Sequence, residues 1–141
     1  MVNSAKNDRI LILDFGSQVT QLIARRVRES GVYCEIYPYM KWREGIDIIQ
    51  PLGIILSGGP ASVIEDASPQ VAKEVLDYGV PILAICYGQQ TLCSQLGGKV
   101  ESSNKREFGR ANIEITEDSK FFDGFDRTNL SEPVWMSHGD K

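Results

Sequence analysis

One of the three cysteines, Cys86, occupies a position at which a nucleophile would be exposed at the edge of a sheet. It follows an apolar run at residues 81–85, which is typical of a buried strand, and precedes an expected helix over residues 88–96. Gly88 permits a tight turn between the two elements. Such a turn pushes the cysteine side chain outward, and the helix N-terminus favours thiolate over thiol. A free cysteine is more often a buried apolar residue, which is the alternative interpretation of Cys86 taken by itself.

A second candidate loop, Ser-Gly-Gly-Pro at residues 57–60, follows another apolar run at residues 53–56. Gly58 and Gly59 allow backbone N–H groups to face a ligand without obstruction by side chains. A plain tight turn is the alternative interpretation. Because ligands of such sheets bind beyond the carboxyl ends of the strands, we expect this loop and Cys86 to lie side by side.

The remaining cysteines and the single histidine are weaker candidates for chemistry. Cys34 and Cys93 are expected to be packing residues, and the odd number of cysteines without paired spacing predicts neither a disulfide framework nor a metal site. His138 could partner a cysteine nucleophile. It lies far along the chain, directly after an expected strand at residues 134–136, in a predicted loop at residues 137–140.

Alternating strand and helix patterns predict the elements that position these residues. The alternation indicates an α/β fold with a doubly wound, mostly parallel sheet. A more polar edge strand is expected at residues 33–37, and a half-exposed antiparallel strand at residues 112–116. The other strands are expected at residues 10–13, 53–56 and 81–85, and the helices at 19–27, at 69–76 after a Ser68 cap with Pro69 as first helical residue, and at 88–96.

Composition predicts one ordinary folded domain. The chain has 141 residues, of which 42% are hydrophobic and 24% charged, which excludes a disordered or low-complexity protein. The net charge of −4 disfavours a nucleic-acid partner. No apolar segment approaches the ~20 residues needed to cross a bilayer, and the first residues do not resemble a signal peptide, so we expect no membrane partner and a cytoplasmic location. Residues 1–8 are expected to form a disordered tail before a domain at residues 9–141.

The residues from Cys86 to Gln90, Cys-Tyr-Gly-Gln-Gln, resemble the Cys-x-Gly-x-Gln signature of class I glutamine amidotransferases. The resemblance implies a flavodoxin-like fold in which Cys86 attacks the side-chain amide of glutamine. It also implies that the N–H groups of Gly59 and Tyr87 form the oxyanion hole. The residues implied to contact glutamine are Gly58, Gly59, Gln90, Ser137, His138, Gly139 and Asp140.

The segment Asp14-Phe15-Gly16-Ser17-Gln18 is similar to the opening of GMP synthases, a family among these amidotransferases. The resemblance implies that ammonia from glutamine serves the ATP-dependent conversion of XMP to GMP in a synthetase domain or subunit. No cofactor is expected in the present domain, whereas ATP and magnesium belong to that synthetase. The full-length protein is expected to be a homodimer.

The catalytic histidine of the family lies in a His-Pro-Glu motif that this sequence does not contain. His138 is therefore expected to contact glutamine rather than to act as the base, and the domain is expected to be truncated before its C-terminal elements. We expect the chain alone to hydrolyse glutamine weakly or not at all. Three alternatives remain open: an amidotransferase of another pathway, a non-catalytic glutamine-binding module, and a cysteine γ-glutamyl hydrolase. An ATP pyrophosphatase loop is disfavoured because Ala61 replaces its aspartate.

Overall fold

A computed structural model describes residues 8–61, 67–125 and 131–140, with the backbone alone for residues 103–107 and 137–140. The chain divides into two compact units, Met1–Glu101 and Ser102–Lys141, each with its own sheet. Most of the predicted N-terminal tail lies outside the described residues. The elements of the first unit are β1 (Arg9–Asp14), α1 (Thr20–Glu29), β2 (Tyr33–Pro38), the 3-10 turn η2 (Tyr39–Lys41), α2 (Trp42–Ile49), β3 (Gly53–Leu56), α3 (Lys73–Leu76), β4 (Ile82–Ala84) and α4 (Tyr87–Gln95).

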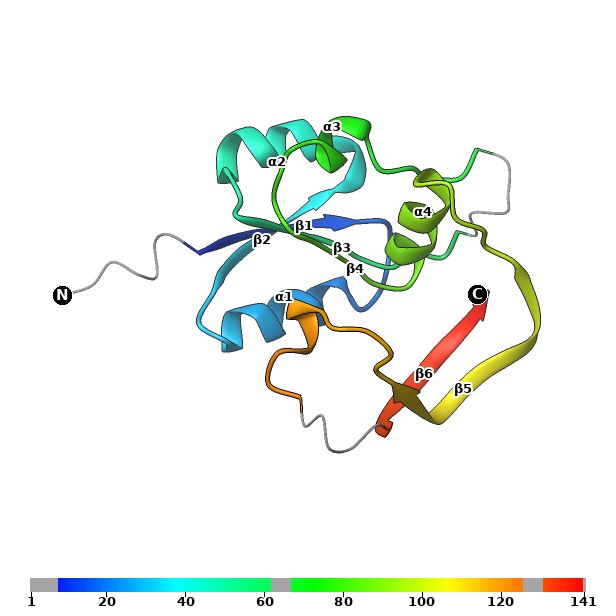
Figure 1. Ribbon diagram of the computed structural model, residues 1–141. Coiled ribbons are helices and arrows are strands. Elements are labelled where there is room, and N and C mark those ends of the chain that lie inside the picture. Colours follow the sequence, from blue (N-terminus) through cyan, green and yellow to red (C-terminus); the bar gives the residue numbers. More distant parts are fainter. Residues whose placement is uncertain (1–7, 62–66, 126–130, 141) are drawn as a thin grey trace. The chain divides into compact units, whose positions relative to one another are not determined.

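The first unit is built on a parallel sheet of four strands in the order β2-β1-β3-β4 (Figure 1). The apolar runs become β1, β3 and β4, as predicted, and β1 and β3 are largely buried because leucine and β-branched side chains can be covered on both faces of a parallel sheet. The expected burial of β4 is wrong, since β4 forms an edge of the described sheet and Leu83 is 37% exposed. The more polar segment becomes β2 at one edge. The predicted doubly wound, mostly parallel α/β architecture is confirmed.

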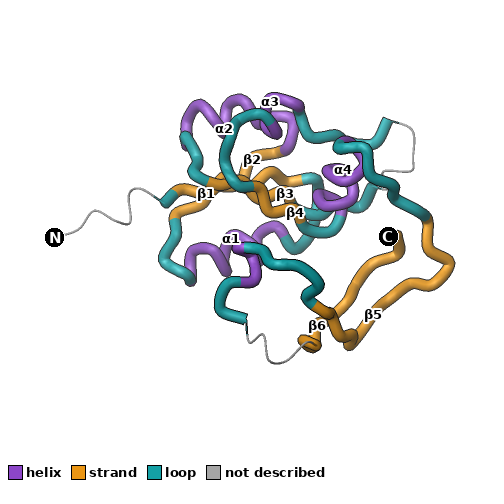
Figure 2. The backbone as a smooth tube through the Cα atoms, in the orientation of Figure 1, coloured by secondary structure: helices purple, strands orange, loops and turns teal. Residues whose placement is uncertain are grey.

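Helices cover both faces of this sheet, and Figure 2 shows them on its two sides. On one face, Leu11 of β1 and Leu56 of β3 pack against residues of α2, α3 and α4. On the other face, Ile12 and Ile55 pack against Ala24 of α1. The alternation of side chains along β1 and β3 therefore builds two cores, one above and one below the same strands.

The predicted helix over residues 69–76 is wrong in its first half. Only Lys73–Leu76 is helical, and its N-cap is Ala72 without a side-chain hydrogen bond, so Ser68 and Pro69 do not start the helix. The physical reason is that neighbouring side chains bind the backbone here. The Pro69 carbonyl accepts a hydrogen bond from the Tyr87 hydroxyl. The Gln95 side chain hydrogen-bonds both the N–H and the carbonyl of Val71. The helix α2 was not foreseen at all.

The second unit is an antiparallel pair of strands with a short 3-10 turn between them. The pairing confirms the predicted antiparallel strand for residues 112–114, whereas residues 115 and 116 lie beyond its end. Residues 134–136 are a strand, as expected. Trp135 in the middle of that segment is 78% exposed. Residues 137–140 are not a loop but continue the strand, because their backbone pairs with β5. The elements are β5 (Ser102–Glu114), η3 (Lys120–Phe122) and β6 (Ser131–Asp140).

Among the described residues, no helix has both the length and the apolar character required to cross a membrane. That part of the chain also holds no cluster of three or more His, Cys, Asp or Glu side chains arranged to bind a metal ion.

The burial of β1 between the two cores can be tested at Leu11. We expect Leu11→Ala to lower the free energy of unfolding by about 2 to 5 kcal/mol, because Leu11 is completely buried and its truncation leaves a cavity. Leu22 lies half exposed on α1, so Leu22→Ala is the matched control, with an expected change within about 0.5 kcal/mol. Urea unfolding measures both. Equal losses in the two variants would contradict the arrangement of the core.

Candidate active site

The loops that follow β3 and β4 lie side by side at the carboxyl edge of the sheet. The N–H of Ile85 donates to the carbonyl of Leu56 at 2.9 Å, which continues the pairing beyond the last residue of β4. A Cβ atom added to Gly58 would lie 3.1 Å from the Cβ atom of Cys86. The structure thus brings Cys86 and the glycine loop together, as the order of the strands requires. Their roles in catalysis stay predictions.

Cys86 lies at the turn between β4 and α4 with an uncommon backbone conformation. Its φ is +52° and its ψ is −119°, a region that non-glycine residues adopt only when the surrounding structure imposes it. The residue is the N-cap of α4, its carbonyl accepts the N–H of Gln90 at 3.1 Å, and its side chain is exposed. A strained, exposed cysteine at the start of a helix is the geometry of a nucleophile elbow.

Gly88 serves close packing rather than the turn conformation that the sequence suggested. The positive φ falls on Cys86, whereas Gly88 lies in the first turn of α4 against the end of β3. A Cβ atom at Gly88 would lie 2.6 Å from the carbonyl oxygen of Leu56 and 2.8 Å from that of Ser57. Only a glycine lets the helix approach the strand this closely, and its N–H donates to the Ser57 carbonyl at 3.1 Å.

The glycine loop is held against the end of β1. A Cβ atom at Gly59 would lie 2.3 Å from the carbonyl oxygen of Phe15, a separation that no side chain tolerates. The Phe15 ring in turn contacts the Tyr87 ring, with 5.5 Å between their centroids, and stacks on Tyr39 at 4.9 Å. Buried aromatic rings therefore support both the loop and the first residue of α4.

The remaining predicted site residues are distributed between the two units. Gln90 lies in the first turn of α4, on the same element as Tyr87. Ser137, His138, Gly139 and Asp140 lie in β6 of the second unit, where only their backbone is described. Their contact with glutamine, and that of Gln90, stays a prediction.

The other two cysteines differ sharply in environment. Cys34 is buried in β2, its thiol donates to the carbonyl of Ala24 at 3.4 Å, and burial raises its pKa. This agrees with the packing role expected for Cys34. Cys93 is exposed on α4, so its predicted packing role is wrong.

Several residues that shape the site were missed by sequence reasoning. The hydroxyls of Thr20 and Ser57 lie 3.0 Å apart at the start of the glycine loop. The Gln95 side chain hydrogen-bonds both the N–H and the carbonyl of Val71. Ser57 directly follows a buried strand and Thr20 begins a helix, which were the available signals. Their contact joins positions 37 residues apart, which hydrophobic periodicity does not reveal.

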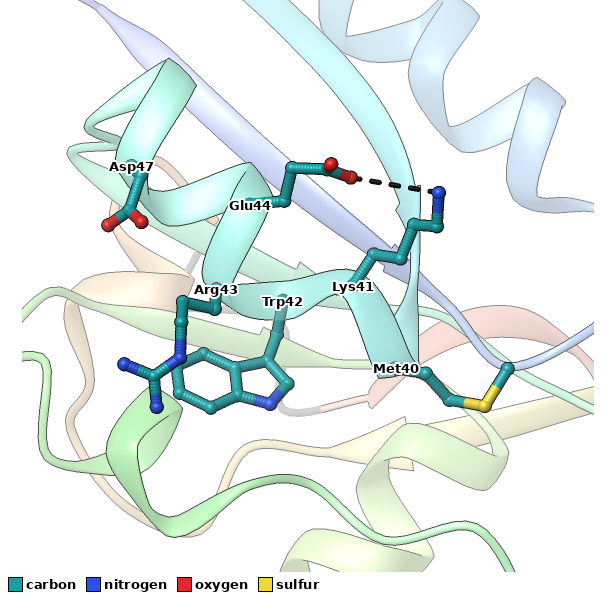
Figure 3. A pocket seen from close by; sticks show the side chains of 6 residues that line it. All are labelled: Met40, Lys41, Trp42, Arg43, Glu44 and Asp47. Atoms are coloured by element: carbon teal, nitrogen blue, oxygen red, sulfur yellow. Dashed lines mark ion pairs between the residues drawn. The ribbon is translucent and has the colours of Figure 1, made fainter.

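A surface hollow of about 520 Å³ lies at η2 and the start of α2, apart from the residues around Cys86 (Figure 3). The Arg43 guanidinium lies 4.6 Å from the centroid of the Trp42 ring, and Lys41 forms an ion pair with Glu44 at 3.8 Å. The side chains that line the hollow therefore carry charges of both signs. The lining residues are Met40, Lys41, Trp42, Arg43, Glu44 and Asp47.

The fold and the turn define a class of protein, a doubly wound α/β protein with a thiol at a nucleophile elbow. The family model for glutamine amidotransferase class I matches residues 11–141. The chain belongs to this family, which confirms the resemblance seen in the residues from Cys86 to Gln90.

Curated relatives agree with that assignment. The chain is 59% identical over 141 residues to a GMP synthase [glutamine-hydrolyzing] of Agrobacterium fabrum and 58% identical to one of Phenylobacterium zucineum. It spans 27% of the length of each relative and is matched over its whole length.

Solved structures agree on the fold. A Thermoplasma acidophilum protein described as a GMP synthase subunit matches 95% of this chain and 66% of its own, with a TM-score of 0.78 and 30% identity. A glutamine amido transferase of Methylobacillus flagellatus matches 97% of this chain and 57% of its own with a TM-score of 0.62. At 16% identity, the second likeness shows the fold alone.

The contact between α4 and β3 can be tested by adding one methyl group. We expect Gly88→Ala to lower the free energy of unfolding by about 1 to 3 kcal/mol, because the new Cβ meets two backbone carbonyl oxygens that cannot move independently. Ser94→Ala, at an exposed position of the same helix, is the control and should change stability by less than about 0.5 kcal/mol. A Gly88→Ala protein as stable as the control would show that α4 does not pack this closely.

Proposed function

We propose that this chain is the glutamine-hydrolysing part of a GMP synthase. The observation that carries the proposal is the placement of the strained, exposed Cys86 beside the loop of Gly58 and Gly59. The names of the similar proteins, GMP synthase [glutamine-hydrolyzing], support the choice of reaction. A cytoplasmic location is proposed from the polar first residues and the lack of a long apolar segment, and a homodimeric full-length protein from resemblance alone.

The reaction begins when the Cys86 thiolate attacks the side-chain amide carbon of glutamine. A C–S bond forms, and the carbonyl oxygen takes the negative charge. The N–H groups of Gly59 and Tyr87 are proposed to stabilise this oxyanion, an effect worth about 3 kcal/mol per donor. Collapse of the intermediate breaks the C–N bond and releases ammonia once the nitrogen has gained a proton. Water then hydrolyses the thioester to glutamate and regenerates the thiol.

Ammonia is proposed to pass to a synthetase region or subunit that converts XMP to GMP. ATP and magnesium would act in that synthetase, and no cofactor is proposed for the present chain. The chain spans 27% of the length of its curated relatives, and the remainder of those proteins is long enough to hold such a synthetase region.

Two cysteine variants test the proposal in the complete enzyme, meaning this chain together with its synthetase. We expect Cys86→Ala to abolish glutamate release from glutamine and glutamine-dependent GMP formation, because the nucleophile is lost. GMP formation from added ammonium should persist, because that step does not need the thiol. Cys93→Ala removes the other exposed thiol, which lies on α4, and should leave all three activities unchanged.

The alternatives predict different results in the same assay. Glutamine binding without turnover in the wild-type enzyme would indicate a non-catalytic module. Faster turnover of other γ-glutamyl compounds than of glutamine would indicate a γ-glutamyl hydrolase. Full glutamine hydrolysis by Cys86→Ala would contradict the proposed nucleophile.

A further inference from the structure

Two buried hydroxyl groups lie directly beneath the glycine loop. Ser57 is 0% exposed and Thr20 is 2% exposed. Burying a hydroxyl is unfavourable unless hydrogen bonds replace those lost to water. Both side chains have such partners, and the partners come from three separate segments of the chain.

The hydrogen bonds connect the end of β1, the start of α1 and the loop after β3. The Thr20 hydroxyl lies 2.9 Å from Oδ1 of Asp14 and 3.0 Å from Oγ of Ser57. The N–H of Phe15 donates to Oγ of Ser57 at 3.3 Å, and that hydroxyl lies 3.1 Å from the Gly58 carbonyl oxygen. The Ser57 side chain therefore fixes the first residue of the glycine loop to two neighbouring elements.

The backbone of Ser57 makes two further contacts that reach the elements on either side. Its N–H donates to the Leu13 carbonyl of β1 at 3.0 Å. Its carbonyl accepts the N–H of Gly88 at 3.1 Å, two residues after Cys86. Ser57 thus lies at the junction of β1, the glycine loop and the helix that begins after Cys86.

We propose that Ser57 and Thr20 are positioning residues for glutamine hydrolysis. Their hydroxyls hold the loop of Gly58 and Gly59 at the fixed distance from Cys86 that an oxyanion hole requires. The inference rests on the proposed function and adds to it two residues that act on the reaction without touching the substrate. Preorganised donors lose most of their effect when the reacting atoms are displaced by about 1 Å.

The backbone contacts alone would keep the loop near its place, so loss of the hydroxyls should loosen it rather than unfold it. The bonds from Ser57 to Leu13 and Gly88 do not involve a side chain. Removal of either hydroxyl should therefore act on the catalytic step more than on substrate binding.

The test uses the complete enzyme and compares Thr20→Val with Thr20→Ser. Valine keeps the shape of threonine without the hydroxyl, and serine keeps the hydroxyl. We expect Thr20→Val and Ser57→Ala to lower kcat for glutamine hydrolysis about tenfold or more, with KM changed less than about threefold. Thr20→Ser should restore kcat to within about twofold of the wild type. GMP formation from added ammonium should be unaffected in all three.

Thr91→Val is the matched control for loss of a buried hydroxyl. Thr91 is as buried as Thr20 and bonds Gln95 and the Pro69 carbonyl, away from the glycine loop. Thr91→Val should lower the melting temperature to a similar extent as Thr20→Val but leave kcat nearly unchanged.

Unchanged kcat in Thr20→Val and Ser57→Ala would overturn the proposal, as would an equal loss of kcat in Thr91→Val or in Thr20→Ser. If Ser57→Ala does not fold, the two Thr20 variants decide the question. An enzyme that hydrolyses glutamine without Cys86 would instead overturn the proposed function, so the two failures are distinct.

Discussion

Parallel pairing of β3 with β4 determines where the reactive cysteine lies. The register places Leu56 opposite Ala84, so the loop after β3 and the turn after β4 leave the sheet at the same level. A slip of two residues would move Cys86 by about 6.6 Å along the strand and away from Gly58. The close approach of α4 to β3 and the short distance between Cys86 and Gly58 both depend on this register.

The surroundings of that junction explain how a strained backbone persists there. A positive φ at a cysteine costs on the order of 1 to 3 kcal/mol and survives only where neighbouring contacts over-determine the conformation. The contacts here are the hydrogen bond from the Gly88 N–H to the Ser57 carbonyl and the pairing of Ile85 with the end of β3. These contacts hold the turn in its strained conformation, in which the thiol of Cys86 is exposed.

Local patterns in the sequence predicted the parts of the structure that local physics determines. The strands could be recognised as short β-branched runs. The strained conformation of the turn falls on Cys86 itself, whereas the nearby glycine, Gly88, serves close packing. Contacts between distant residues could not be recognised. Gln95 binds the backbone 24 residues away and replaces the first turn of the helix expected at Pro69, and Thr20 meets Ser57 across 37 residues. The continuation of β6 past Ser137 likewise depends on its partner strand rather than on its own residues.

The central claim is that the sheet edge forms a glutamine pocket around one selected thiol. Its most direct test is alkylation of the complete enzyme by a glutamine-like chloroketone, with each cysteine followed by peptide mass spectrometry. We expect modification of Cys86 at least about tenfold faster than of Cys93, which is also exposed, suppression by glutamine, and no early modification of Cys34, whose pKa is raised by burial. Equal rates at Cys86 and Cys93, without protection by glutamine, would contradict the claim.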